Sequence, residues 1–187
     1  MKIFVVGASG VLGRAMLVHL RGHEVAGTTR SPDKLAALAA LGARGVRCDI
    51  YAPGALRAAM IAAAPDVVVN FLTDLAGGLG PGNARIRSVG GPIVVDAARA
   101  AGARRLLVES IAFATSPESD AAVAALEDGA RASGLEAVIL RFGRFWGPGT
   151  WREASPAEPP TVHVDLAGRR AAELIDEAPG VYTITDP

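Results

Sequence analysis

A glycine-rich turn offers the clearest chemistry in the sequence. Gly7, Gly10 and Gly13 are spaced three residues apart and directly follow the apolar run at residues 3–6. In a strand–turn–helix unit, the first glycine permits a sharp turn, the second lets a pyrophosphate approach the backbone, and the third lets the helix pack closely. The N-terminus of that helix offers free N–H groups to phosphates. We therefore predict a dinucleotide site rather than a simple tight turn. The predicted contacts here are Gly7, Ser9, Gly10, Val11, Leu12 and Gly13.

The residues after the predicted second strand, 24–29, indicate which dinucleotide is bound. An NAD site usually has an acidic residue at this point for the ribose hydroxyls, but here Arg30 and Ser31 follow the strand. A guanidinium can pair bidentately with the 2′-phosphate of NADP. Asp33 follows Pro32 at a helix start, where an acidic residue complements the helix dipole. We predict NADP with Arg30 and Ser31 as ligands; the alternatives are NAD and a solvent-exposed Arg30.

Few other side chains are placed for catalysis. Ser110 follows the predicted strand 105–109, at the carboxyl end where open α/β sheets bind ligands, so its hydroxyl can orient a carbonyl or simply cap a turn. Arg141 ends another strand and either pairs with a buried carboxylate or faces the ligand. Trp146 and Trp151 either form a wall over a substrate or cover the core. Ser110 is our candidate catalytic residue, and we predict no metal site.

The composition excludes several classes of function. Half of the 187 residues are apolar, and 19 basic residues balance 19 acidic ones. A neutral chain lacks the charge that nucleic acids and membrane surfaces attract. No apolar stretch reaches the length of a transmembrane helix or a signal peptide. Its single cysteine, Cys48, excludes an internal disulfide, which is typical of a reducing cytoplasm.

Short apolar runs alternate with longer helical segments along the chain. Such βα alternation predicts an α/β fold with a doubly wound parallel sheet. We expect one domain over residues 1–187, in which 147–187 forms a shortened substrate-side cap. The predicted strands are 3–6, 24–29, 45–48, 66–72, 105–109, 137–141 and 181–185. The predicted helices are 12–21, 32–41, 53–64, 85–101 (kinked at 90–92), 119–133 and 164–178.

Several motifs beyond the glycine turn resemble the short-chain dehydrogenases/reductases of the extended or atypical kind. They are RLLVESIAF at 105–113, VILRFGRFWGPG at 138–149, VHVDLA at 162–167 and GVYTITD at 180–186. In this respect the chain is similar to the NAD-dependent epimerase/dehydratases, and the likeness runs from end to end. The resemblance implies a Rossmann-like fold. It also implies adenine contacts from Asp49 and Ile50, and ribose contacts from Phe71, Leu72 and Thr73.

Two features depart from that family. Its chemistry uses a tyrosine with a lysine four residues later, which lowers the tyrosine pKa. Here Tyr51 and Tyr182 are followed at that spacing by Ala55 and Asp186, and no lysine lies beyond Lys34. The region that usually holds the substrate is also reduced to residues 150–161.

The resemblance therefore implies an NADP-dependent oxidoreductase without a Tyr-Lys pair, which transfers a hydride to or from a small carbonyl or imine. One alternative is a non-catalytic NAD(P)-binding sensor or regulatory protein. Another is a sugar-nucleotide-type epimerase or dehydratase. The implied partners are a small-molecule substrate and a second copy of the chain, which would pair through helices 85–101 and 119–133. Such alanine-rich helix faces equally suit ordinary packing on a sheet.

Overall fold

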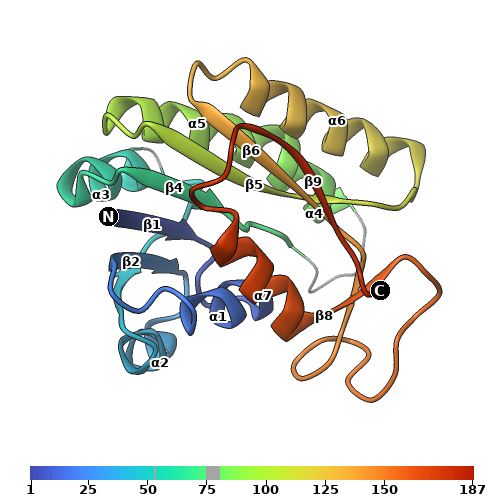
Figure 1. The fold of residues 1–187 in the computed structure, drawn as a ribbon. Coiled ribbons are helices and arrows are strands. Elements are labelled where there is room, and N and C mark those ends of the chain that lie inside the picture. Colours follow the sequence, from blue (N-terminus) through green and yellow to red (C-terminus); the bar gives the residue numbers. More distant parts are fainter. Residues whose placement is uncertain (53, 75–80) are drawn as a thin grey trace.

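A seven-stranded parallel β-sheet forms the centre of the protein, as the βα alternation predicts (Figure 1). The computed structural model describes residues 1–52, 54–74 and 81–187. The strand order is β3-β2-β1-β4-β5-β6-β9, so the order reverses between β1 and β4. The strands are β1 (Lys2–Val6), β2 (Glu24–Thr29), β3 (Ala43–Arg47), β4 (Val67–Asn70), β5 (Arg105–Ile111), β6 (Glu136–Phe142) and β9 (Gly180–Ile184).

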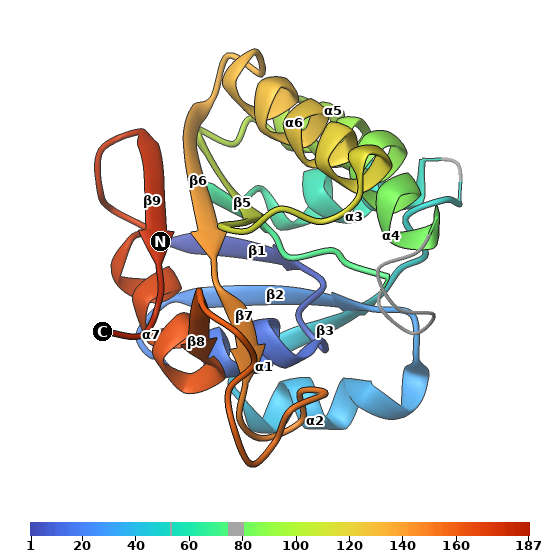
Figure 2. The ribbon, with the colours of Figure 1, turned by 90° about the vertical axis from the view of Figure 1, so that its right-hand side faces the viewer.

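Helices cover both faces of the sheet, which confirms the doubly wound fold. Figure 2 shows α1, α2 and α7 on one face and α3, α5 and α6 on the other. Each face has its own buried apolar cluster, because side chains of a strand point alternately to the two faces. The helices are α1 (Val11–Leu17), α2 (Leu35–Ala40), α3 (Ala55–Ala63), α4 (Pro81–Arg85), α5 (Gly91–Ala100), α6 (Pro117–Arg131) and α7 (Val164–Glu173).

Some elements differ from their predicted form. The helix predicted at 85–101 is α4 and α5 joined by a π-helical turn, Ile86–Gly90, which ends where the kink was expected. The strand predicted at 66–72 spans Val67–Asn70, and the backbone N–H of Phe71 still donates to the carbonyl of Val6 at 2.9 Å. The helix predicted at 53–64 begins at Ala55, and Pro53 lies outside the described residues.

A two-stranded ribbon after β6 forms a small second sheet. It consists of β7 (Arg144–Trp146) and β8 (Thr161–His163), which enclose the proline-rich loop. The sequence analysis predicted neither of these strands. Gly143 allows β6 to continue into the ribbon, because a Cβ there would lie 2.7 Å from the carbonyl carbon of Thr161.

The packing of α1 on α7 fixes the glycine-rich turn. The two helices cross closely at Gly168, where a Cβ would lie 2.4 Å from the carbonyl carbon of Ala15. This contact anchors α1, whose first turn follows the glycines. Among the described residues, no helix combines the length and the apolar character that crossing a membrane requires.

Candidate functional site

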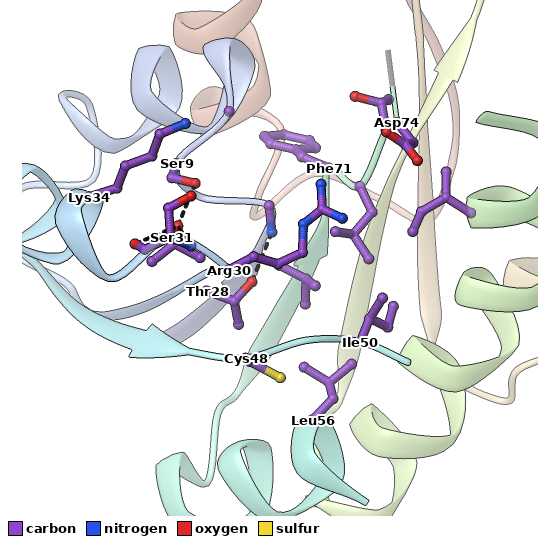
Figure 3. A pocket seen from close by; sticks show the side chains of 17 residues that line it. Ser9, Thr28, Arg30, Ser31, Lys34, Cys48, Ile50, Leu56, Phe71 and Asp74 are labelled. Atoms are coloured by element: carbon purple, nitrogen blue, oxygen red, sulfur yellow. Dashed lines mark hydrogen bonds between the residues drawn. The ribbon is translucent and has the colours of Figure 1, made fainter. Parts of the chain in front are cut away.

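A cleft lies at the carboxyl ends of β1, β2 and β4, between the glycine-rich turn and the segment after β4 (Figure 3). This is the edge where the strand order reverses, which is where open α/β sheets bind ligands. Nine of the predicted cofactor-binding residues line it: Gly7, Ser9, Gly10, Arg30, Ser31, Ile50, Phe71, Leu72 and Thr73.

The other predicted cofactor residues do not line this cleft. Leu12 and Gly13 are buried in the body of the protein, and Val11 is half-buried. Asp49 is exposed and its carboxylate accepts a hydrogen bond from the backbone N–H of Tyr51. For these four, and for the nine in the cleft, contact with a cofactor stays a prediction.

Steric constraints explain why glycines form the turn. Gly7 has a φ of +85°, and a Cβ there would lie 2.7 Å from the carbonyl oxygen of Phe71. At Gly13 a Cβ would lie 2.6 Å from the carbonyl oxygens of Gly7 and Ala8. Gly10 differs, because a Cβ there would meet only the carbonyl oxygen of Gly7, at 3.2 Å. Gly10 therefore borders open cleft, as a backbone that receives a pyrophosphate should.

A hydroxyl network joins the glycine-rich turn to the end of β2. Ser9 Oγ donates to Thr29 Oγ1 at 3.0 Å, and the backbone N–H of Ser31 donates to the same atom at 3.2 Å. The backbone N–H of Gly7 donates to Thr28 Oγ1 at 3.0 Å. These bonds hold the glycine-rich turn and the loop after β2 in a fixed relation.

Two cations reach the cleft from the β2 side. The side chains of Arg30 and Lys34 both line it, and neither makes an ion pair with any described residue. Lys34 ends a 3₁₀ turn, Pro32–Lys34, that brings it back beside Ser31. The carboxylate among the described lining residues is Asp74, which lies across the cleft in Figure 3. Asp33 does not line the cleft, in accord with a role at the helix start.

The prediction missed several lining residues. The sequence analysis gave Lys34 no role in the cleft, although its position within one turn of Ser31 is a usable signal. The apolar lining residues have no local sequence signal. The missed residues are Val6, Thr28, Thr29, Lys34, Cys48, Leu56, Asp74 and Ile86.

Ser110 belongs to a buried charged network instead of the cleft lining. Its hydroxyl is fully buried and donates to Glu127 Oε1 at 2.6 Å. Arg141 donates to both oxygens of Glu127, at 2.8 and 2.6 Å, and Arg131 donates to Oε2 at 2.8 Å. Burial on its own would raise the pKa of Glu127, but hydrogen bonds from Arg141, Ser110 and Arg131 lower it to about 2. The structure thus pairs Arg141 with a buried carboxylate, one of the two alternatives, while catalysis by Ser110 stays a prediction.

A second network fastens the β7–β8 ribbon to the end of the chain. Asp186 accepts hydrogen bonds from Trp146 Nε1 at 2.7 Å, Thr161 Oγ1 at 2.9 Å and the His163 backbone N–H at 2.9 Å. Trp146 also packs edge-on against the His163 ring. By contrast, Trp151 is 69% exposed. Trp146 therefore has a structural role that accounts for its position, whereas Trp151 does not cover the core.

Neither tyrosine lines the cleft, and both have local partners. Tyr182 lies in β9, and its hydroxyl donates to the carbonyl of Ala178 at 2.7 Å. Tyr51 stacks beneath Arg85, whose guanidinium carbon lies 4.7 Å from the ring centroid. Both are accounted for by local packing.

Comparisons with known proteins agree with this geometry. A family model described as NAD(P)H-binding matches residues 7–155. A 3-diazoavenalumate denitrifying reductase from a Streptomyces species is 33% identical over 235 aligned residues, which cover 100% of this chain and 76% of the relative. Because the aligned stretch is longer than this chain, the relative carries additional residues within it.

Solved structures show the same fold at lower identity. A Bacillus halodurans protein assigned to the NAD-dependent epimerase/dehydratases has a TM-score of 0.84 and 19% identity, over 100% of this chain and 94% of that one. The UDP-glucose 4-epimerase of Thermus thermophilus, in complex with NAD, has a TM-score of 0.78 and 18% identity, over 99% and 78% of the two chains.

Proposed function

The chain belongs to the NAD(P)H-binding family, and we propose that it is an NADP-dependent oxidoreductase that moves a hydride between the nicotinamide and a small carbonyl or imine. Membership of the family confirms the resemblance seen in the sequence. When bound, the cofactor supplies the hydride, and the protein supplies position and electrostatics. The observation that carries the proposal is the cleft bordered by Gly10 and by the cations Arg30 and Lys34.

The charges in the cleft support NADP over NAD. A 2′-phosphate on the adenosine ribose carries a negative charge that NAD lacks. Arg30 offers a planar guanidinium for bidentate pairing, Lys34 offers a point charge, and Ser31 offers a hydroxyl. The corresponding place in an NAD site holds an acidic residue, which would repel that phosphate.

Calorimetric titration with NADPH and NADH tests this preference. We expect Arg30→Ala and Lys34→Ala each to weaken NADPH binding by about tenfold to a hundredfold, as for loss of a charge-assisted hydrogen bond of about 1.5–3 kcal/mol. NADH binding should change little. Arg44→Ala, an exposed cation in β3 outside the cleft, is the matched control. Equal affinity of the wild type for both cofactors would refute the preference, and binding of neither would refute the function.

The substrate proposal depends on the missing Tyr-Lys pair and the short cap. Without that pair, suitable acceptors are small electrophiles that either need no protonation or receive a proton from another group. The Streptomyces relative is named a 3-diazoavenalumate denitrifying reductase, which suggests a diazo compound for the panel. A protonated diazo carbon, that is a diazonium, takes up hydride and releases N₂ without a further proton. A panel of small aldehydes, imines and one diazo compound, followed by loss of NADPH absorbance, therefore tests the substrate class.

A non-catalytic sensor is the second candidate, and the absence of the Tyr-Lys pair favours it. A sensor should bind NADP(H) tightly but oxidise NADPH with no member of the panel. An enzyme should turn over at least one member, and turnover should be lost together with NADPH binding in Gly10→Phe, which fills the open side of the turn.

A further inference from the structure

Two residues of opposite charge, Glu109 in β5 and Arg87 in the turn before α5, are buried without a direct partner among the described residues. Glu109 is 7% exposed and Arg87 is 4% exposed. In the part of the chain that the structure describes, neither side chain makes a hydrogen bond or an ion pair, and Arg87 Nε has no partner at all. Native proteins rarely leave buried charged groups without a hydrogen bond or an ion pair, so the presence of Glu109 and Arg87 here requires an explanation.

Neither residue lines the cleft, but each lies next to a residue that does. Val108 pairs with Asn70, the last residue of β4, so Glu109 lies level with Phe71, which lines the cleft. Arg87 lies in the π-helical turn between α4 and α5, beside Ile86, which also lines the cleft. Such π turns occur frequently at functional sites.

Stability does not account for the pair. A buried ion pair without direct contact gains little Coulombic energy against the cost of removing both charges from water. Burial raises the pKa of Glu109 to about 7, although the positive charge of Arg87 acts in the opposite direction. Because this pKa lies above 4.5, folding favours the protonated carboxyl, and ionisation of Glu109 lowers stability as the pH rises from 4.5 towards about 7. An apolar or amide side chain would serve the fold at least as well.

We propose that Glu109 is the proton donor for the hydride-transfer reaction, in place of the missing tyrosine, and that Arg87 stabilises the carboxylate left behind. This inference rests on the proposed oxidoreductase function. When bound, the cofactor supplies a hydride to the substrate carbon and is oxidised. The carbon–oxygen or carbon–nitrogen π bond opens onto the heteroatom, which bonds to the proton released from the Glu109 O–H group. A proton from water then restores the carboxyl, so that the substrate has gained two electrons and two protons in total.

Cofactor binding alone tests whether Glu109 faces the nicotinamide. The oxidised ring is positively charged and favours a nearby carboxylate, whereas the reduced ring is neutral. Calorimetry in buffers of different ionisation enthalpy should show that NADP⁺ binding near neutral pH releases more protons than NADPH binding. This difference should disappear in Glu109→Gln and persist in Glu118→Gln, an exposed control in α6. Equal proton release for both cofactors in the wild type, or an unchanged difference in Glu109→Gln, would overturn the proposal.

Two acceptors then test proton donation itself. Benzaldehyde needs a proton as well as a hydride, whereas the N-methyl-dihydroisoquinolinium cation, a quaternary iminium, needs only the hydride. Glu109→Gln should lower kcat for benzaldehyde by about a hundredfold or more, with KM nearly unchanged, and leave iminium reduction intact. In the wild type, kcat for benzaldehyde should fall as the pH rises through about 7, and the iminium should show no such fall.

Failure of the proposed role of Glu109 and failure of the proposed oxidoreductase function give different results in these experiments. Equal losses for the two acceptors, or no loss for either, would overturn proton donation by Glu109. If the wild type reduces neither probe, the proton-release measurement alone decides. A wild type that binds neither NADP⁺ nor NADPH would instead refute the proposed function. Glu109→Gln should remain at least as stable as the wild type at neutral pH, and marked destabilisation would indicate a structural pair.

Discussion

Replacing Glu127 with glutamine removes a carboxylate that accepts hydrogen bonds from side chains of β5, β6 and α6. Three side chains donate to it, Ser110 from β5, Arg141 from β6 and Arg131 from its own helix. Glutamine has nearly the same volume but cannot accept from all three donors, and its amide N–H₂ faces at least one of them. The variant therefore removes the charge while keeping the packing.

The magnitude follows from the pKa of Glu127. A fall from 4.5 to about 2 corresponds to about 3 kcal/mol, because one pKa unit equals about 1.4 kcal/mol. This is an upper value, since Arg141 and Arg131 are 42% and 44% exposed and water weakens their attraction. We expect Glu127→Gln to lower the free energy of unfolding by about 2–3 kcal/mol near pH 7, and the melting temperature by about 4–12 °C.

The pH dependence distinguishes charge from packing. Because the pKa is lowered by folding, the stabilisation is fully present above pH 4.5 and is lost as the pH falls towards about 2. Urea unfolding followed by circular dichroism at about pH 7, 4.5 and 3 should show the gap between wild type and variant narrowing with acid. Asp128→Asn, whose side chain is 77% exposed on the same helix, is the control and should change stability little. The same loss at all three pH values would refute the reasoning.

Two further predictions concern the contact of α1 with α7 and the ribbon of β7 and β8. Gly168→Ala should lower stability by about 1–3 kcal/mol in thermal unfolding, because its Cβ would overlap the backbone of Ala15, whereas Gly129→Ala, with open space around it, should stabilise α6 slightly. A stable Gly168→Ala protein would show that α1 and α7 can separate at little cost. Trp146→Phe should lose about 1 kcal/mol and expose the loop after β7 to faster proteolysis, because the bond to Asp186 is removed. Unchanged proteolysis would mean that the other two bonds to Asp186 hold the ribbon unaided.

The alternation of apolar runs and helices was sufficient to predict the main sheet, because each parallel strand needs a crossover helix. The ribbon of β7 and β8 was not predictable in this way. Each of its strands has three residues, and the two pair across a long loop, so no local periodicity marks them. Only the closeness of Gly143 to Thr161, a tertiary feature, explains why the chain leaves β6 there.

The lining residues of the cleft were predictable from the sequence where local backbone geometry requires one residue type. They were less predictable elsewhere. Gly7 is required by its positive φ, and Gly13 by backbone contacts within the turn itself, so their spacing was informative. Leu12 lies between Gly10 and Gly13 in sequence, but its side chain points into the core. Lys34 reaches the cleft only because a 3₁₀ turn follows Ser31 in place of a continuous helix.

For the polar residues of β5, burial follows from the position of the strand inside the sheet. The sequence pattern of the strand does not reveal it. This strand lies between β4 and β6 with helices on both faces, so its residues are buried from Arg105 to Ser110 whichever way their side chains point. A charged residue here must therefore find a partner or lose stability. Arg105 bonds to Glu136 and to two carbonyls after α7, and Ser110 bonds to Glu127. Within the described chain, Glu109 alone among the polar side chains of β5 has no such bond, and a proton-donating role at the adjoining cleft would explain why a carboxyl group stands at that position.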